Sequence, residues 1–323
     1  MSPAPPADLD RQEVYQQPTS TCDVVMKGGI TSGVIYPKAI CELARKHRLR
    51  QVGGSSAGAI AAAAAAAAEH GRESETGGFA RLAKLPHWVA ETPATDKDSN
   101  LFHLFQPQEK TAPYYRLFVG HMKVKGKAAK LAVVAKAAML GFPGRLVGSI
   151  TIGVLIGLLP LLLGGNGWDA LNLVAWTLLG GIVGVALVGV GAAKGFLRET
   201  KDNGFGLCRG SRAPALEGPP PLSDWLADEL DLLAGIEADH GPLTFGDLEK
   251  TGINLAMMTT GLNTGMPYRL PFDQRIWFFK PEELEDYFPP RVIEAMRTKA
   301  GTPEPDDPPG YLRLPDADDL PVV

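Results

Sequence analysis

The chain has 323 residues, of which 45% are hydrophobic, which is enough for one large domain with a buried core and for an inserted segment. Its formal net charge of −4 argues against nucleic acid as the main partner. Cys22, Cys41 and Cys208 show no paired spacing, so we expect reduced thiols and neither a disulfide framework nor a metal site.

The first elements are a polar leader, a strand and a glycine-rich loop. Residues 1–20 are rich in proline and have no apolar core segment, so we expect a disordered leader and not a secretion signal. A strand is expected over residues 22–27, followed by a loop from Gly28 to Gly33 and then a helix. Glycine has no side chain, so the amides of such a loop can approach a ligand closely. The loop matches neither the nucleotide phosphate loop nor the dinucleotide fingerprint.

The second strand is expected over residues 49–52 and is followed by Gly54-x-Ser56-x-Gly58 and a run of alanines. This is the pattern of a nucleophile elbow, in which a serine occupies a sharp turn between a strand and a helix. Side chains at positions 54 and 58 would collide with the neighbouring strand and helix, which explains both glycines. The same residues also fit a plain Gly/Ser turn before an alanine-rich helix.

The loop and the elbow together resemble the motifs of patatin-like phospholipases. That family pairs a Gly-Gly-Gly-x-Arg/Lys-Gly loop with a Gly-x-Ser-x-Gly elbow a few dozen residues later. The loop aligns without gaps to residues 28–33, where Ile30 replaces the third glycine and Ser32 replaces the basic residue. The resemblance covers about residues 22–70 and implies an α/β fold in which helices cover a parallel sheet.

The resemblance also implies a set of site residues and a substrate class. Ser56 would be the nucleophile, and the oxyanion would be held by Gly28, Gly29 and the amide of Ala57. Gly33 would complete the loop motif, and Gly54 and Gly58 the elbow. The implied substrates are acyl esters of phospholipids or related lipids, and neither a cofactor nor a metal is required.

Two long apolar runs, Leu146 to Gly165 and Leu171 to Ala193, are separated by a short break. Each run is about 30 Å long as a helix, which matches the hydrocarbon thickness of a bilayer. We therefore expect a two-pass hairpin over residues 146–193, although a buried hairpin in a soluble domain is the alternative. Basic residues flank only the outer ends, which predicts that both ends and the catalytic domain are cytoplasmic.

The segments on either side of the hairpin are mixed. Residues 101–145 are an aromatic and basic juxtamembrane segment, whose aromatic side chains fit an acyl site, a membrane surface or core packing. Residues 194–222 are expected to be a linker, and residues 223–323 the second part of the core that begins with residues 21–100. The expected elements of this second part are helices over 224–236 (capped by Ser223), 244–249, 281–287 and 290–299, strands over 253–260 and 275–279, and an exposed tail from residue 302.

The general base is missing from the sequence pattern. Patatin-like enzymes use an Asp in Asp-Gly-Gly or Asp-Gly-Ala, but in this chain no Asp precedes a Gly and no His follows His240. Asp316, Asp318 and Asp319 lie in the tail that we expect to be exposed. We therefore name no base, and we expect the catalytic Asp to lie beyond residue 323 in a longer form of the protein.

These expectations combine into a membrane-anchored patatin-like lipid acyl hydrolase that forms an acyl-enzyme. One alternative is a non-catalytic membrane protein of the same fold that acts in lipid binding or assembly. Another is a serine esterase or thioesterase for small acyl substrates, which the hairpin disfavours because soluble substrates do not require an enzyme fixed in lipid.

Overall fold

The computed structural model describes residues 8–29, 32–93, 98–130, 132, 136, 143–162, 170–211, 219–237, 240–273 and 276–323. The chain forms two compact units. The first unit combines Met1–Phe105 with Gly210–Val323, and the second is the inserted stretch Gln106–Arg209.

The first unit contains a four-stranded sheet in the order β1 (Ser20–Met26), β2 (His47–Ser55), β3 (Asn254–Thr260) and β4 (Pro267–Leu270). The first three strands are parallel, and β4 is an antiparallel edge strand. Parallel neighbours need a crossover connection, and α1 (Ser32–Ala44) lies between β1 and β2. The expectation of a mixed α/β fold with a parallel sheet is confirmed, and the carboxyl ends of β1, β2 and β3 share one edge.

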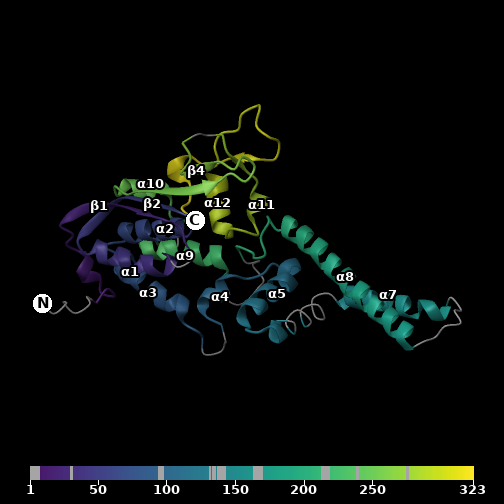
Figure 1. The fold of residues 1–323 in the computed structure, drawn as a ribbon. Helices are drawn as coiled ribbons and strands as arrows, with labels where there is room; N and C mark the ends of the chain where they lie inside the picture. The colour runs from purple at the N-terminus through teal and green to yellow at the C-terminus, as the bar shows by residue number, and fades with distance from the viewer. Residues whose placement is uncertain are drawn as a thin grey trace. The chain divides into compact units, whose positions relative to one another are not determined.

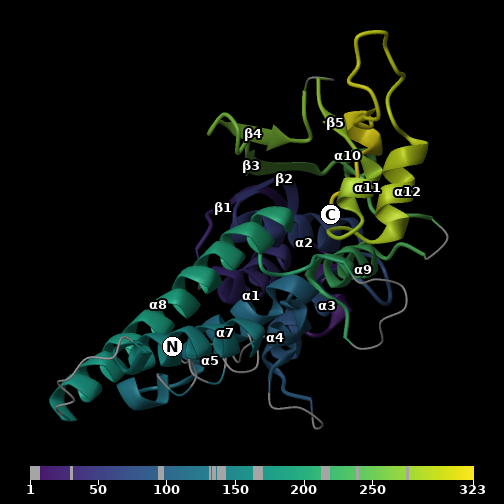
Figure 2. The same cartoon turned by 90° about the vertical axis from the view of Figure 1, so that its right-hand side faces the viewer.

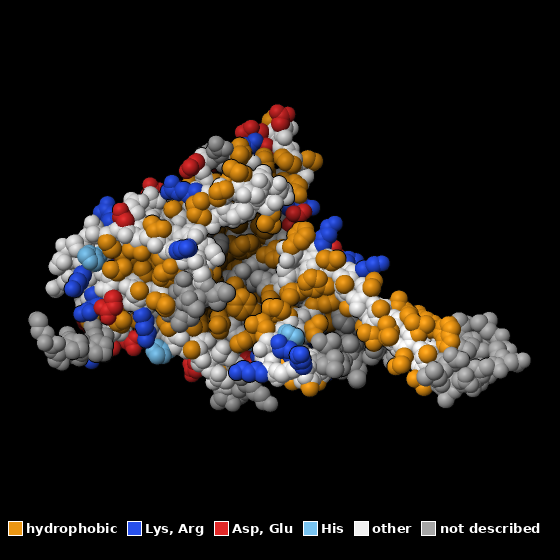
Figure 3. All heavy atoms as spheres, in the orientation of Figure 1, with side chains coloured by type: hydrophobic (Ala, Val, Ile, Leu, Met, Phe, Trp, Pro, Cys, Tyr) orange, Lys and Arg blue, Asp and Glu red, His pale blue; other side chains and the backbone are white. Residues whose placement is uncertain are grey.

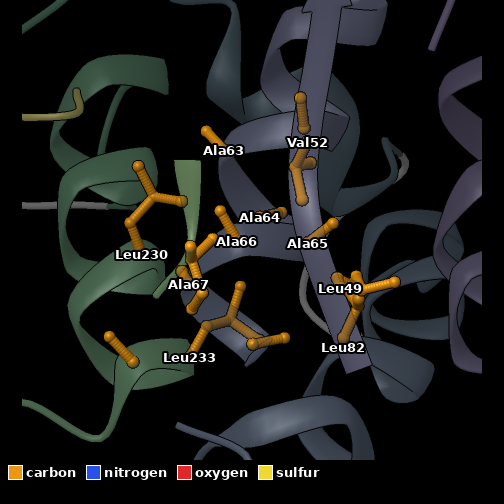
Figure 4. Close-up of a cluster of buried hydrophobic side chains, with 14 of the residues drawn as sticks. Leu49, Val52, Ala63, Ala64, Ala65, Ala66, Ala67, Leu82, Leu230 and Leu233 are labelled. Atoms are coloured by element: carbon orange, nitrogen blue, oxygen red, sulfur yellow. The ribbon is translucent and has the colours of Figure 1, made fainter. Parts of the chain in front are cut away.

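Helix α2 (Ala57–His70) follows β2 directly and packs against the sheet, with α1, α3 (Gly78–Ala90) and α9 (Leu222–Ala234) around it (Figure 1). Its alanines 62–68 are all buried, because small side chains let the helix lie close to its neighbours. Figure 4 shows these alanines among larger side chains of β2, α3 and α9, namely Leu49, Val52, Leu82, Leu230 and Leu233.

A buried ion pair between Glu69 and Arg72 lies at the C-terminal end of α2. Arg72 is 1% exposed, and its guanidinium donates to both carboxylate oxygens of Glu69 at 2.8 and 2.5 Å. The remaining N–H groups donate to the backbone carbonyls of Tyr15, Ala44 and His47 at 2.6 to 2.9 Å. All five donors of Arg72 are therefore used, and the side chain ties together the first residues, α1 and β2.

The remaining elements of the first unit are short. The helices are α4 (Asn100–Leu104), α10 (Phe245–Lys250), α11 (Pro281–Leu284) and α12 (Pro290–Thr298), and β5 (Phe278–Phe279) pairs with β6 (Leu312–Arg313) outside the main sheet. Single-turn 3-10 helices cover Gln12–Tyr15, Glu109–Thr111 and Ala317–Asp319, the second of them in the inserted unit.

Both chain ends differ from the sequence expectation. Residues 8–20 are ordered, because Tyr15 is fully buried and its hydroxyl donates to the carbonyl of Leu9. The expected exposed tail returns to the core, where Leu320 and Val322 are buried and Val322 donates to the carbonyl of Leu243. These contacts correct the expectations of a disordered leader over residues 8–20 and of a solvated tail.

Two helix starts also need correction. Helix α9 begins at Leu222 after Pro221, so Ser223 lies inside the helix and is not its N-cap. Helix α10 begins at Phe245, so Thr244 is its N-cap and not its first residue. Thr244 and Asp247 form a full capping box, in which each side chain accepts a hydrogen bond from the backbone amide of the other residue. Helix α3 continues through Pro86 without a break.

The second unit consists mainly of α5 (Ala112–Lys123), α7 (Pro143–Leu162) and α8 (Ala170–Asp202). Helices α7 and α8 lie side by side in Figures 1 and 2, and they coincide with the two apolar runs. Helix α8 continues to Asp202, which corrects the expected start of a linker at residue 194. The expected loop residues 166–169 lie outside the described residues.

The hairpin helices approach each other closely at glycines. A Cβ atom at Gly153 would lie 2.7 Å from the carbonyl oxygen of Gly180, so only glycine fits there. Within the described residues, one helix stretch, Val174–Asp202, is long and apolar enough to cross a membrane, with a mean hydropathy of 2.0. In Figure 3 apolar side chains cover the visible face of α8, and basic side chains gather toward one end.

The two ends of the inserted unit are paired with each other. Pro107 and Cys208 form an antiparallel bridge, and Arg209 donates to the carbonyl of Gln106 at 2.9 Å. Thr111 is fully buried beside them and donates to the carbonyl of Gln108 at 3.0 Å. The chain therefore enters and leaves the unit at one place, as an inserted segment requires.

Candidate active site

Ser56 lies between the last residue of β2 and the first residue of α2, and its side chain is exposed. Its backbone has φ 55° and ψ −131°, a conformation with positive φ that residues other than glycine adopt rarely. Strained residues of this kind persist only where the surrounding structure fixes them, and they concentrate at functional sites. The strand-turn-helix context expected of a nucleophile elbow is present around Ser56.

The two elbow glycines are required by close backbone contacts. A Cβ atom at Gly54 would lie 2.0 Å from the carbonyl oxygen of Gly58. A Cβ atom at Gly58 would lie 2.2 Å from the carbonyl oxygen of Met26, at the end of β1. Neither separation is possible for a real side chain, so the steric explanation of both glycines is confirmed.

The glycine-rich loop lies directly against the serine. A Cβ atom at Gly28 would lie 2.6 Å from Cβ and 3.2 Å from Oγ of Ser56. This proximity follows from the sheet, because β1 and β2 are parallel neighbours and both the loop and the elbow follow their carboxyl ends. The structure thus brings Gly28 and Ser56 together, as the sequence predicts.

The rest of the loop leads from Gly28 into α1. Gly29 is exposed, and Gly33 lies in the first turn of α1. Positions 30 and 31, which include the third-glycine substitution, lie outside the described residues. The hydroxyl of Tyr36 donates to the carbonyl of Lys27 at 2.7 Å and so fastens the loop to α1. Tyr36 was not predictable from the sequence, since no motif marks it.

The start of α2 supplies further donors. The first amides of a helix have no intrahelical acceptor, and the helix dipole favours negative charge there. Ala57 and Gly58 begin α2, while the amide of Ala59 already donates to the carbonyl of Ser56 at 2.8 Å. The amide of Ala57 is therefore free of the helix ladder beside Ser56, which is the position that an oxyanion donor needs.

Among the described residues, the hydroxyl of Ser56 makes no hydrogen bond to a base or to any other group. Asp319 pairs with Lys299 at 3.1 Å. Asp316 and Asp318 are exposed and line a cavity of about 330 Å³ whose described lining does not include Ser56. None of the three tail carboxylates is thus paired with the serine.

His70 and His87 contact side chains other than Ser56. His70 ends α2, about 20 Å along the helix from Ser56, and its ring contacts the Thr251 hydroxyl at 3.1 Å. Burial lowers the pKa of His70. His87 contacts the ammonium of Lys38 at 3.3 Å, and Trp88 stacks on Trp225 with ring centroids 5.2 Å apart. The ring stacking identifies Trp88 as a packing residue.

Among the described residues, no cluster of three or more His, Cys, Asp or Glu side chains is placed to hold a metal. Cys41 is fully buried, and burial raises the pKa of its thiol to about 12. A thiol with so high a pKa is not a nucleophile near neutral pH. The chemistry that the described site can support is therefore centred on Ser56.

The chain is similar to the RpoH suppressor of Rhizobium meliloti (strain 1021), with 36% identity over an alignment of 336 residues. The alignment covers 95% of this chain and 50% of the relative, so the chain spans about half the length of the curated relative that it matches. No family model matches the chain, and no solved structure matches it.

Proposed function

We propose that this protein is a membrane-anchored, patatin-like lipid acyl hydrolase with Ser56 as its nucleophile. The observation that carries the proposal is the strained, exposed Ser56 at a strand-to-helix turn, with Gly28 packed against its side chain. The relative's name connects that protein with RpoH and states no chemistry, so the proposal rests on the site alone.

The arrangement suits acyl transfer. Oxygen Oγ of Ser56 attacks the ester carbonyl, the carbonyl oxygen becomes an oxyanion, and the alcohol leaves to give an acyl-enzyme that water hydrolyses. Amides of Gly28, Gly29 and Ala57 are the proposed donors to the oxyanion. Such donors contribute about 10²–10³-fold each to the rate when they are already in place.

The proposal requires a base for the proton of Ser56, and the described residues place none beside it. We propose that an Asp outside residues 1–323 supplies it, in a longer form of the protein. The curated relative is about twice as long as the aligned chain, which leaves room for such a residue. General-base assistance is worth about 10²–10⁴-fold, so the 323-residue chain should be a weak hydrolase.

The membrane part of the proposal concerns α7 and α8. Both helices coincide with apolar runs, they pack against each other, and basic side chains follow the apolar part of α8. We propose that they insert as a two-pass hairpin with both ends on the cytoplasmic side. Such an anchor suits an enzyme with a lipid substrate, because the anchor keeps the enzyme at the surface where that substrate resides.

The test is the release of fatty acid from mixed phospholipid vesicles. The 323-residue chain is compared with a form extended along its native reading frame, each with and without Ser56→Ala. We expect only the extended wild-type form to exceed its own mutant clearly. Turnover by the short form that Ser56→Ala removes would place the base within these residues, and Asp316, Asp318 and Asp319 would be the first to replace.

The second candidate is a non-catalytic protein of the same fold that binds lipid. The specific observation that favours it is the lack of a hydrogen-bond partner for the Ser56 hydroxyl among the described residues. In that case the extended form and its Ser56→Ala variant would bind vesicles equally strongly, and neither would release fatty acid.

A further inference from the structure

A stripe of large apolar side chains runs along α5. Tyr114, Phe118 and Met122 are spaced by four residues and so share one face of the helix. Tyr114 is 7% exposed and packs edge-on against Phe196 of α8, with ring centroids 5.5 Å apart. Phe118 and Met122 continue the same face but are 58% and 68% exposed. The stripe therefore begins against α8 and continues beyond it without cover from the described residues.

The contact with α8 fixes the level of this stripe relative to the apolar run. Ala193 is the last residue of the run and Lys194 the first charged residue after it. Phe196 follows Ala193 by three residues, which is about 4.5 Å along the helix axis. Tyr114 is therefore anchored where the apolar part of α8 ends, and aromatic side chains at this level are typical of a membrane–water interface.

The charge of the surrounding sequence also favours a lipid surface. From Ala112 to Lys130 the chain contains no acidic residue. Arg116 lies on the side of α5 opposite the stripe, whereas the lysines that follow the stripe are Lys123, Lys125, Lys127 and Lys130, of which the first three are exposed. Basic side chains beside an apolar helix face attract anionic head groups while the apolar face enters the boundary of the acyl chains.

We propose that α5 is an interfacial helix that docks on an anionic phospholipid surface beside the hairpin. Phe118 and Met122 enter the boundary between head groups and acyl chains, and the lysines that follow contact lipid phosphates. A lipid surface fits better than a protein partner, because the stripe continues a contact with the helix that carries the apolar run. The inference rests on the proposed insertion of the hairpin.

The test places an environment-sensitive fluorophore at single cysteines in a variant that lacks the three native cysteines. Phe118→Cys reports on the stripe, Arg116→Cys on the opposite side of α5, and Val185→Cys on the exposed face of α8. Each full chain is reconstituted into phosphatidylcholine vesicles with or without phosphatidylglycerol. Nitroxide lipids with a shallow or a deep spin label serve as quenchers, and iodide in solution reports on exposure to water.

We expect the deep label to quench position 185, the shallow label to quench position 118, and iodide to quench position 116. Quenching at 118 should be stronger with phosphatidylglycerol, and it should lose that preference when Lys123, Lys125 and Lys127 are changed to Gln. Quenching by lipid labels at position 185 but not at position 118 would contradict the interfacial helix and would still support the membrane hairpin. If neither position is quenched by lipid, both the anchor and the interfacial helix are wrong.

Discussion

Gly53 and Gly54 are adjacent residues of β2, yet a side chain would meet different surroundings at the two positions. At Gly54 a Cβ atom would lie 2.0 Å from a backbone carbonyl oxygen of α2, whereas at Gly53 the nearest atom is the carbonyl oxygen of Ala256 at 3.4 Å. The sequence pattern distinguishes the two residues correctly, because Gly54 belongs to the elbow motif and Gly53 does not. The position of Gly28 against Ser56 was likewise predictable from the order of strand, loop and elbow.

We therefore expect Gly54→Ala to lower the free energy of unfolding by about 1–3 kcal/mol or more, because backbone must move to admit the methyl group. Gly53→Ala serves as the matched control, and its effect should stay within about 1 kcal/mol. Denaturant unfolding of the purified chain in detergent measures both. Equal losses at the two positions would contradict the close contact between β2 and α2.

A second residue-scale prediction concerns the buried ion pair. Arg72→Met leaves the buried carboxylate of Glu69 without its partner, so we expect a loss of about 3–5 kcal/mol in the free energy of unfolding. Arg48→Met is the control, because the Arg48 side chain is 48% exposed and lies 4.0 Å from the same carboxylate. Its loss should be below about 1 kcal/mol. A small effect of Arg72→Met would show that the pair is not essential to the core.

At the scale of elements, strong local patterns were predictable and long-range contacts were not. The apolar runs coincide with α7 and α8, and the alanine run with α2. The leader and the tail were misjudged because their composition is polar, while their burial depends on a few apolar side chains, Tyr15, Leu320 and Val322, that contact distant parts of the chain. The starting residue of α9 was misjudged because proline and serine are both plausible at a helix start.

The hairpin gives the prediction at this scale. Gly153→Val would place a side chain against the backbone of Gly180, so the two helices must separate, and we expect a loss of about 1–3 kcal/mol. Gly148→Val, on the same helix, is the control, because a Cβ atom at Gly148 would meet no atom within 4 Å. Thermal unfolding of the detergent-solubilised chain compares them. If both variants melt alike, the close approach of α7 and α8 at Gly153 does not stabilise the hairpin.

At the scale of the whole molecule, the first unit should lose stability in acid. Burial lowers the pKa of His70 in the folded chain, even though Asp247 opposes this effect. As pH falls below about 6.5, the unfolded chain binds a proton at His70 before the folded chain does, so the folded state loses relative stability. We expect His70→Gln to flatten the stability profile between about pH 7.5 and about pH 5.5. An unchanged slope would show that other groups cause the acid sensitivity.

The proposed function requires Ser56 to be an activated nucleophile in the complete protein. The most direct measurement is labelling of the extended form, in membranes, with a fluorophosphonate probe, followed by mass-spectrometric mapping of the modified residue. We expect modification of Ser56, its loss in Ser56→Ala and its retention in Ser55→Ala. Modification of another serine, or labelling that persists at full strength in Ser56→Ala, would contradict it.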